Sequence, residues 1–114
     1  MAAGETLIDI GSIVYSGADI NAAGTTQGTA TAITTDTVRV TTAIGQTGVI
    51  LPATPGYARL FIDHLAGGAA SMNLFPPTGG QINALGANNA ANLATGAQIE
   101  AWSVKADNSQ WYTR

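Results

Sequence analysis

The fold of this chain is decided by the stretch Ala58-Arg59-Leu60-Phe61-Ile62-Asp63-His64-Leu65, the clearest strand in the sequence. Side chains at alternate positions of a strand point to opposite faces, so Leu60, Ile62 and His64 share one face. The residues between them are charged or aromatic, and they share the other face. An alternation of this kind predicts a half-buried β-strand.

Shorter stretches of the same character lie on both sides of this strand. Val38 and Val40 alternate with polar residues, and the threonines around them suit a strand because a branched Cβ packs well on a pleated surface. Residues 84–95 are alanine-rich but contain a glycine and three asparagines, so we expect a loop or an irregular edge there. The further strands that we expect are residues 29–34, 37–42, 48–51, 71–75, 81–83, 98–105 and 110–113.

Turn-forming residues separate these stretches and indicate the fold class. Pro52 and Pro55-Gly56 end one strand, because proline lacks the N–H that a β-ladder requires. About seven or eight short strands, with turn signals roughly every 8–12 residues, predict an all-β protein built as an antiparallel, jelly-roll-like β-sandwich. No strict internal repeat is visible, so a solenoid is not expected.

The first 28 residues differ in character from the remainder. Short apolar stretches alternate there with small polar residues, and such stretches cannot form a core alone. We therefore expect residues 1–28 to form an extended N-terminal arm and residues 29–114 to form the sandwich domain. An arm of this kind can add to a neighbouring subunit. Its candidate contact residues are Leu7, Ile8, Ile10, Ile13, Val14 and Tyr15.

Composition excludes several classes of function. Only 10% of the 114 residues are charged, against about 25% in an average soluble domain, and the net charge is −3. Binding to nucleic acid needs clustered lysine and arginine, whereas this chain has four such residues, widely spaced. The absence of cysteine excludes disulfides and cysteine-based zinc sites. No apolar run approaches the roughly 18 residues that span a membrane, and no signal peptide is apparent, so we expect synthesis in a cytoplasm and no membrane partner.

The polar residues form no recognisable catalytic motif. His64 is the single histidine, and on the apolar face of its strand we expect it to be a structural residue at a buried or an edge position. Asp63 is not expected to pair with it, because neighbouring residues of a strand point to opposite faces. Gly67-Gly68 and Gly79-Gly80 lack the Lys-Ser/Thr that follows in a phosphate-binding loop, and no Gly-x-Ser-x-Gly motif occurs. The sequence therefore predicts a protein that is not an enzyme and that needs no cofactor or metal.

Three aromatic residues on the last two expected strands have two possible roles. Trp102, Trp111 and Tyr112 could close the core or a subunit interface, with each indole N–H bonded to a backbone oxygen. They could also form a platform on which a sugar ring stacks. We favour the core or interface role, and the platform supports an alternative function.

A surface with so few charges favours an oligomer. Charged side chains normally keep a monomer soluble and protect its sheet edges from pairing with other chains. Large uncharged surfaces are more often covered by a partner. We therefore expect a homo-oligomer that docks onto a larger assembly.

Six segments follow one another along the chain: Thr29–Thr34, Gly48–Pro52, Arg59–Ile62, Leu74–Pro76, Gly79–Gly86 and Gln110–Tyr112. Taken in this order, they resemble a β-rich module that is common in small structural proteins of tailed bacteriophages. The resemblance covers roughly residues 25–114.

This resemblance implies a structural component of the virion with no catalytic residues. The implied protein is a capsid decoration (cement) protein, a homotrimer that binds across subunits of the major capsid protein and stabilises the shell. It would lie on the outer capsid surface after synthesis in the host cytoplasm, with the arm residues contacting a neighbouring subunit or the capsid. The same kind of module occurs in tail fibres. The alternative is therefore a tail-fibre or spike domain that binds a host-surface glycan through Trp102, Trp111 and Tyr112.

Overall fold

A computed structural model describes residues 17–53, 59–65 and 70–114. Within these residues the chain forms ten strands, one 3-10 turn (η1) and no α-helix. The six candidate contact residues of the arm, from Leu7 to Tyr15, lie outside the described residues, so their role stays a prediction. The elements in chain order are β2 (Ala18–Asn21), η1 (Gln27–Thr29), β3 (Thr31–Ala32), β4 (Thr37–Thr41), β5 (Gly48–Ile50), β6 (Arg59–His64), β7 (Met72–Phe75), β8 (Gln81–Ile82), β9 (Ala91–Leu93), β10 (Gln98–Ser103) and β11 (Gln110–Thr113).

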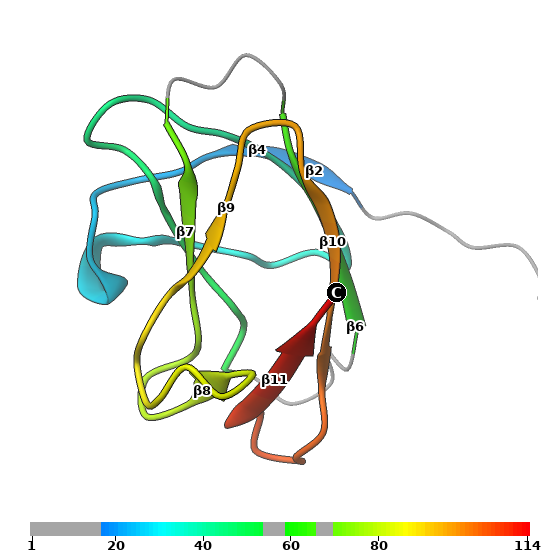
Figure 1. The fold of residues 1–114 in the computed structure, drawn as a ribbon. Coiled ribbons are helices and arrows are strands. Elements are labelled where there is room, and N and C mark those ends of the chain that lie inside the picture. Colours follow the sequence, from blue (N-terminus) through cyan, green and yellow to red (C-terminus); the bar gives the residue numbers. More distant parts are fainter. Residues whose placement is uncertain (1–16, 54–58, 66–69) are drawn as a thin grey trace, which may run out of the picture.

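The strands form two sheets that face each other (Figure 1). One sheet has six strands in the order β2-β4-β6-β10-β11-β8, and the other has four in the order β3-β5-β7-β9. From β2 to β10, successive strands alternate between the two sheets. The predicted all-β class is confirmed, with ten described strands in place of the expected seven or eight.

The pairing of the strands is mixed, so the predicted antiparallel, jelly-roll-like arrangement is wrong. From β2 to β7, strands that follow one another in sequence lie in opposite sheets, and each strand returns to its own sheet in the direction of its predecessor there. β2, β4 and β6 pair in parallel, as do β3, β5 and β7, and β8 pairs in parallel with β11. Only β10 with its two neighbours and β7 with β9 are antiparallel among the described pairs. The alternation of residues marks each strand but does not specify its partner or its direction.

The parallel strands wind as a coil with two strands in each turn, an arrangement related to a solenoid. The paired residues are 20 apart between β2 and β4, 24 apart between β4 and β6, 18 apart between β3 and β5, and 25 apart between β5 and β7. Because these spacings are unequal, the coil leaves no repeat in the sequence. The lack of a repeat was therefore a poor guide to this part of the fold.

The described part of the expected arm is integrated into the six-stranded sheet. β2 lies along β4 with Ala18 opposite Val38. The N–H of Ala22 then donates to the carbonyl oxygen of Thr41 at 2.9 Å, and the Ala22 side chain joins the core. Residues 17–28 therefore belong to the body of the fold.

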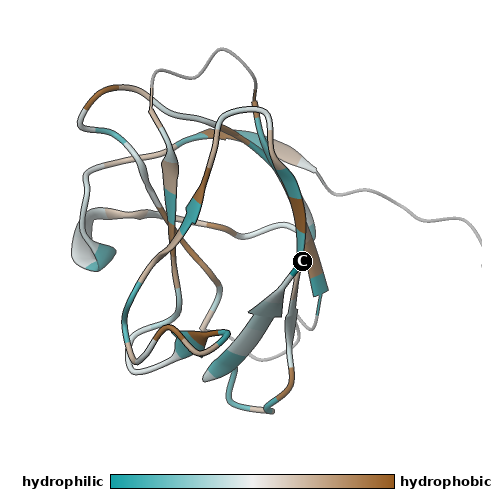
Figure 2. Ribbon diagram, in the orientation of Figure 1, coloured by the Kyte–Doolittle hydropathy of each residue, from teal (hydrophilic) through white to brown (hydrophobic). Residues whose placement is uncertain are grey.

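Both sheets contribute to one hydrophobic core. Along β6 every second residue is buried, which gives this strand one buried face. Hydrophobic and hydrophilic residues follow one another along β10 (Figure 2). Trp111 has no exposed surface, and its indole Nε1 donates to the carbonyl oxygen of Asn108 at 3.0 Å. The core residues from the strands are Val38, Val40, Leu60, Ile62, Ile82, Ala101 and Trp111 of the six-stranded sheet and Val49, Met72, Leu74 and Leu93 of the four-stranded sheet.

His64 links the two sheets from within the core. Its side chain is fully buried, and Nδ1 donates to the carbonyl oxygens of Leu93 and Ala94 at 3.1 and 3.0 Å. Nε2 lies 2.9 Å from Oγ1 of Thr42, which in turn donates to the carbonyl oxygen of Ala70 at 2.6 Å. We predicted a structural histidine at a buried or an edge position, and the structure places His64 at a buried one.

We expect His64→Ala to lower the free energy of unfolding by about 2–4 kcal/mol, because it opens a cavity and leaves buried polar groups without partners. Urea denaturation would measure the loss. Thr95→Ala, on an exposed turn beside β9, is the control and should change stability by less than about 0.5 kcal/mol. A similarly small loss for His64→Ala would contradict the linking role.

Candidate functional site

Charged side chains gather on the outer face of the six-stranded sheet, which we call the ionic face. The structure describes nine charged residues, and six of them lie here. In contrast, β3, β5, β7 and β9 of the other sheet contain no charged residue. The six residues of the ionic face are Asp19, Arg39, Arg59, Asp63, Glu100 and Arg114.

The register between β6 and β10 arranges the outward side chains in three rows. The inward residues of β6 are buried, so the residues between them point away from the core. β10 runs antiparallel to β6, and its outward residues stand directly opposite those of β6. The rows are Arg59 with Trp102, Phe61 with Glu100, and Asp63 with Gln98.

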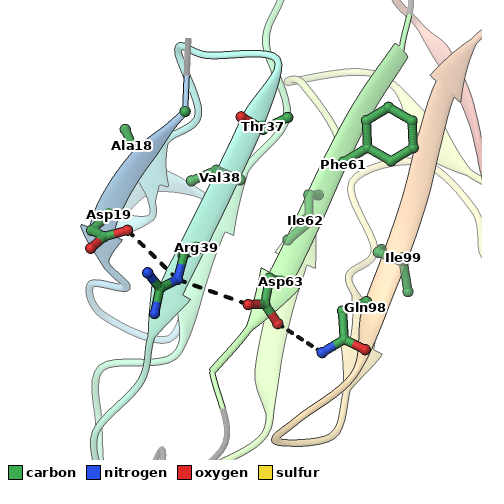
Figure 3. Close-up of a pocket in the computed structure, with 11 residues that line it drawn as sticks. Ala18, Asp19, Thr37, Val38, Arg39, Phe61, Ile62, Asp63, Gln98 and Ile99 are labelled. Atoms are coloured by element: carbon green, nitrogen blue, oxygen red, sulfur yellow. Dashed lines mark hydrogen bonds and ion pairs between the residues drawn. The ribbon is translucent and has the colours of Figure 1, made fainter. Parts of the chain in front are cut away.

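At one end of the ionic face, Arg39 lies between two carboxylates, and we call Asp19, Arg39 and Asp63 the Arg39 cluster (Figure 3). Arg39 Nε is 3.8 Å from Asp19 Oδ1 and 3.9 Å from Asp63 Oδ2. The amide of Gln98 donates to Asp63 Oδ1 at 2.9 Å. Two carboxylates and one guanidinium give this end a formal excess of one negative charge.

At the other end, Glu100 lies between two guanidinium groups, and we call Arg59, Glu100 and Arg114 the Glu100 cluster. Glu100 Oε2 is 2.6 Å from Arg59 Nε, and Oε1 is 3.2 Å from Arg114 Nη2. The Glu100 side chain is only 14% exposed, whereas the two arginines are 62% and 74% exposed. This end therefore presents a formal excess of one positive charge, carried by arginines that extend into solvent.

An exposed aromatic ring and a hollow lie beside the Arg39 cluster. Phe61 occupies the middle row opposite Glu100 and is 48% exposed. A hollow of about 740 Å³ is lined by residues of β2, β4, β6 and β10, which include Phe61, Ile99 and all three residues of the Arg39 cluster. The ionic face thus combines an exposed aromatic ring, an adjoining hollow and two clusters of opposite sign.

The three aromatic residues singled out in the sequence do not act together. Trp111 is in the core, which agrees with the role that we favoured for it. Trp102 and Tyr112 lie side by side on the ionic face with ring centroids 6.1 Å apart. The Arg114 guanidinium covers the Trp102 ring at 5.3 Å. A stacking platform of all three rings is therefore not present.

Other polar groups in the described residues have local roles. The hydroxyl and the N–H of Ser109 donate to Asp107 Oδ1 at 2.6 and 3.0 Å, and these bonds hold the pKa of Asp107 below its usual value. No group of three or more metal-ligating side chains occurs among the residues that the structure describes. In the same residues, no helix is long and apolar enough to cross a membrane.

Comparisons with protein-family models, with curated proteins and with solved structures find no match to this chain. The ionic face and the uncharged face opposite it must therefore be interpreted from their own chemistry.

The two charged clusters were not predicted from the sequence, although part of their signal was visible. The alternation within the strand at residues 58–65 placed Arg59, Phe61 and Asp63 on one face. Arg39 joins them only because β4 pairs with β6 in parallel, with Arg39 opposite Asp63. That pairing is a tertiary feature which no local pattern indicates.

We expect Glu100→Gln to lower the free energy of unfolding by no more than about 1 kcal/mol, since both arginine partners are exposed and well solvated. Thermal unfolding at low salt and at about 1 M salt would test this, because screening should remove most of the difference. A loss that persists undiminished at high salt would show that Glu100 acts through packing instead.

Proposed function

We propose that this protein is a structural component of a bacteriophage virion, a capsid decoration protein that binds across major capsid protein subunits and stabilises the shell. The observation that carries the proposal is the uncharged outer face of the four-stranded sheet. The order of segments that resembles a phage structural module gives the proposal its direction. A protein that binds the assembled shell but not its free subunits stabilises the shell by linkage, because binding lowers the free energy of the assembled state only.

The uncharged face is suited to burial under a partner. The amide of Asn92 donates to Asn73 Oδ1 at 3.0 Å, and the amide of Asn73 donates to Thr47 Oγ1 at 3.2 Å, so these polar groups satisfy one another. Covering such a face removes no ion from water, which avoids the main cost of burying polar surface. By the strand register, its outward residues are Ala32, Gly48, Ile50, Asn73, Phe75 and Asn92. Gly48 and Phe75 are buried by neighbouring segments of the chain, so Ala32, Ile50, Asn73 and Asn92 are the ones available to a partner.

A second hollow lies at this side of the molecule and also lacks charge. Its volume is about 470 Å³, and its lining includes Ala32, Ile50, Pro52 and Pro77. The sequence has no Asp, Glu, Lys or Arg over residues 40–58 or 65–99, which together supply most of the four-stranded sheet. An uncharged hollow of this kind can accept an apolar segment of the capsid protein.

The remaining parts of the proposal concern the arm and the assembly. We propose that Leu7, Ile8, Ile10, Ile13, Val14 and Tyr15 contact a neighbouring subunit or the capsid, and that the protein acts as a homo-oligomer on the outer capsid surface. Neither nucleic acid nor a membrane is part of the proposal.

Ala32→Glu should weaken binding to capsids at least about tenfold, because it forces a charge into a contact that has no ion to pair with it. Co-sedimentation of the purified protein with undecorated capsids of the phage that encodes it would measure binding. Ala106→Glu, at an exposed position in the turn between β10 and β11, is the matched control and should bind normally.

Capsids with the bound protein should also rupture at a higher temperature than bare capsids. Equal rupture temperatures, or failure of the wild-type protein to sediment with capsids, would overturn the proposal. Equal binding of Ala32→Glu and wild type would move the contact away from the uncharged face.

We do not advance the alternative of a glycan-binding tail-fibre or spike domain. It depended on stacking by Trp102, Trp111 and Tyr112, and Trp111 has no exposed surface with which to contact a ligand. One side of the Trp102 ring already faces Arg114.

A further inference from the structure

We propose that, in the free protein, the segment that precedes β2 lies across the ionic face of its own chain, with Asp9, Ile13 and Tyr15 facing the sheet. Residues 1–16 lie outside the described residues, and Gly17 is the first residue that the structure places. This contact belongs to the protein before assembly. It does not rest on the proposed function, in which the same segment contacts a neighbour or the capsid once the protein is assembled.

The hollow on the ionic face crosses the strands, and it starts where this segment joins the fold. Gly17 lines the hollow, and the lining continues from Ala18 of β2 through Phe61 to Ile99 of β10 (Figure 3). A Cβ on Gly17 would lie 2.6 Å from Oγ1 of Thr37, so the backbone here lies against an outward side chain of the face. The volume of about 740 Å³ lies within the range of about 300–1,000 Å³ that is typical of binding sites.

The length of the segment matches the width of the face. Four strand spacings separate β2 from β11, and at about 4.8 Å each they give a width of about 19 Å. An extended chain covers about 3.3 Å per residue, so residues 10–15 span about 20 Å. Ser16 is left for the turn out of β2, and Asp9 reaches the far side of the face. The row of outward residues that the segment would follow is Thr37, Phe61, Glu100 and Arg114.

Apolar residues of the segment fall over the apolar part of the face. Side chains at alternate positions of an extended chain point to the same side, so Ile13 and Tyr15 point the same way. They come four and two residues before Gly17, which places them over the hollow. Phe61 is 48% exposed there and offers an aromatic surface. Contact between these side chains removes apolar surface from water, which is the main favourable contribution to docking.

Charge complementarity places the other end of the segment. Residues 1–16 contain no lysine or arginine, and their acidic residues are Glu5 and Asp9. By the same alternation, Asp9 points to the side that faces the sheet. It reaches the Glu100 cluster, where the side chains of Arg59 and Arg114 are 62% and 74% exposed. A carboxylate accepts charge-assisted hydrogen bonds from a guanidinium group, so this end of the face attracts Asp9.

The covalent connection at Gly17 favours the face of the same chain over that of a second copy. Two groups joined by a short connection meet at a high effective concentration, so docking needs no second molecule. The opposite side of the segment carries Ile8, Ile10 and Val14 and is left for a partner.

A nitroxide spin label on the segment tests where it lies. The chain has no cysteine, so Ser12→Cys gives a single labelling site, on the side of the segment that points away from the sheet. We expect the label to broaden the amide NMR signals of Thr37 and Phe61 at least about fivefold more than those of Asn73 and Asn92, because the second sheet packs about 10 Å behind the first.

A mixture of two preparations separates the same chain from a second copy. One preparation carries the spin label without isotope labelling, and the other is isotope-labelled and carries no spin label. Broadening within one chain disappears from the mixture, because no observed chain then holds a spin label. We expect this loss.

Substitutions in the Ser12→Cys background test the two contacts separately. Phe61→Ser and Asp9→Arg should each reduce the selective broadening at least about threefold, and Asp9→Arg keeps the test intact if Phe61→Ser folds poorly. Asp9→Arg/Arg59→Asp should recover part of the broadening, because the pair again has opposite charges. The control is Ile44→Ser, at an apolar residue 86% exposed on the turn between β4 and β5, and it should change nothing.

Equal broadening on the two sheets, or broadening that neither Phe61→Ser nor Asp9→Arg reduces, would overturn the proposal. Broadening that persists in the mixture would also overturn it, because the segment would then lie on a second copy. Since no capsid is present in these measurements, their failure leaves the proposed function standing. Failure of capsid binding, equally, leaves this contact standing.

Discussion

The structure depends on the requirement that every strand bury one face. No described strand is longer than six residues, so none can build a core within a single sheet. The chain meets the requirement by crossing from one sheet to the other at almost every connection. Each crossing places a new apolar face opposite the previous one, and a single core forms between the sheets. The positions of all outward side chains follow from the same arrangement.

The outward side chains divide the molecule into two unlike surfaces. The charges of the described chain are concentrated on one sheet, where most of them pair with each other. The other sheet contains alanine, glycine, asparagine and apolar residues but no charge. The few charges of the described residues are therefore spread unevenly between the two faces. Neutral polar groups can be covered at low cost, whereas paired charges of both signs favour a partner with matching charges.

Local features were predicted well from the sequence, and features that join distant segments were not. The strand expected at residues 58–65 and the structural histidine within it follow from the alternation of apolar and polar residues. The direction of pairing was missed because turn residues mark where a strand ends but do not show that the chain is changing sheets. The Arg39 cluster was missed for the same reason, since its members lie on three strands whose order is set by the coil.

The small number of basic residues also limits the number of sites at which proteases that cleave after lysine or arginine can cut the folded protein. Arg39 and Arg59 lie within paired strands, and the backbone of Arg114 is bonded to Glu100 through both its N–H and its carbonyl oxygen. Lys105 is the remaining one of the four, and it lies on an exposed turn. Proteases of this class cleave extended segments that can leave the fold. Among the residues that the structure describes, the native protein therefore offers them one readily accessible bond, the one after Lys105.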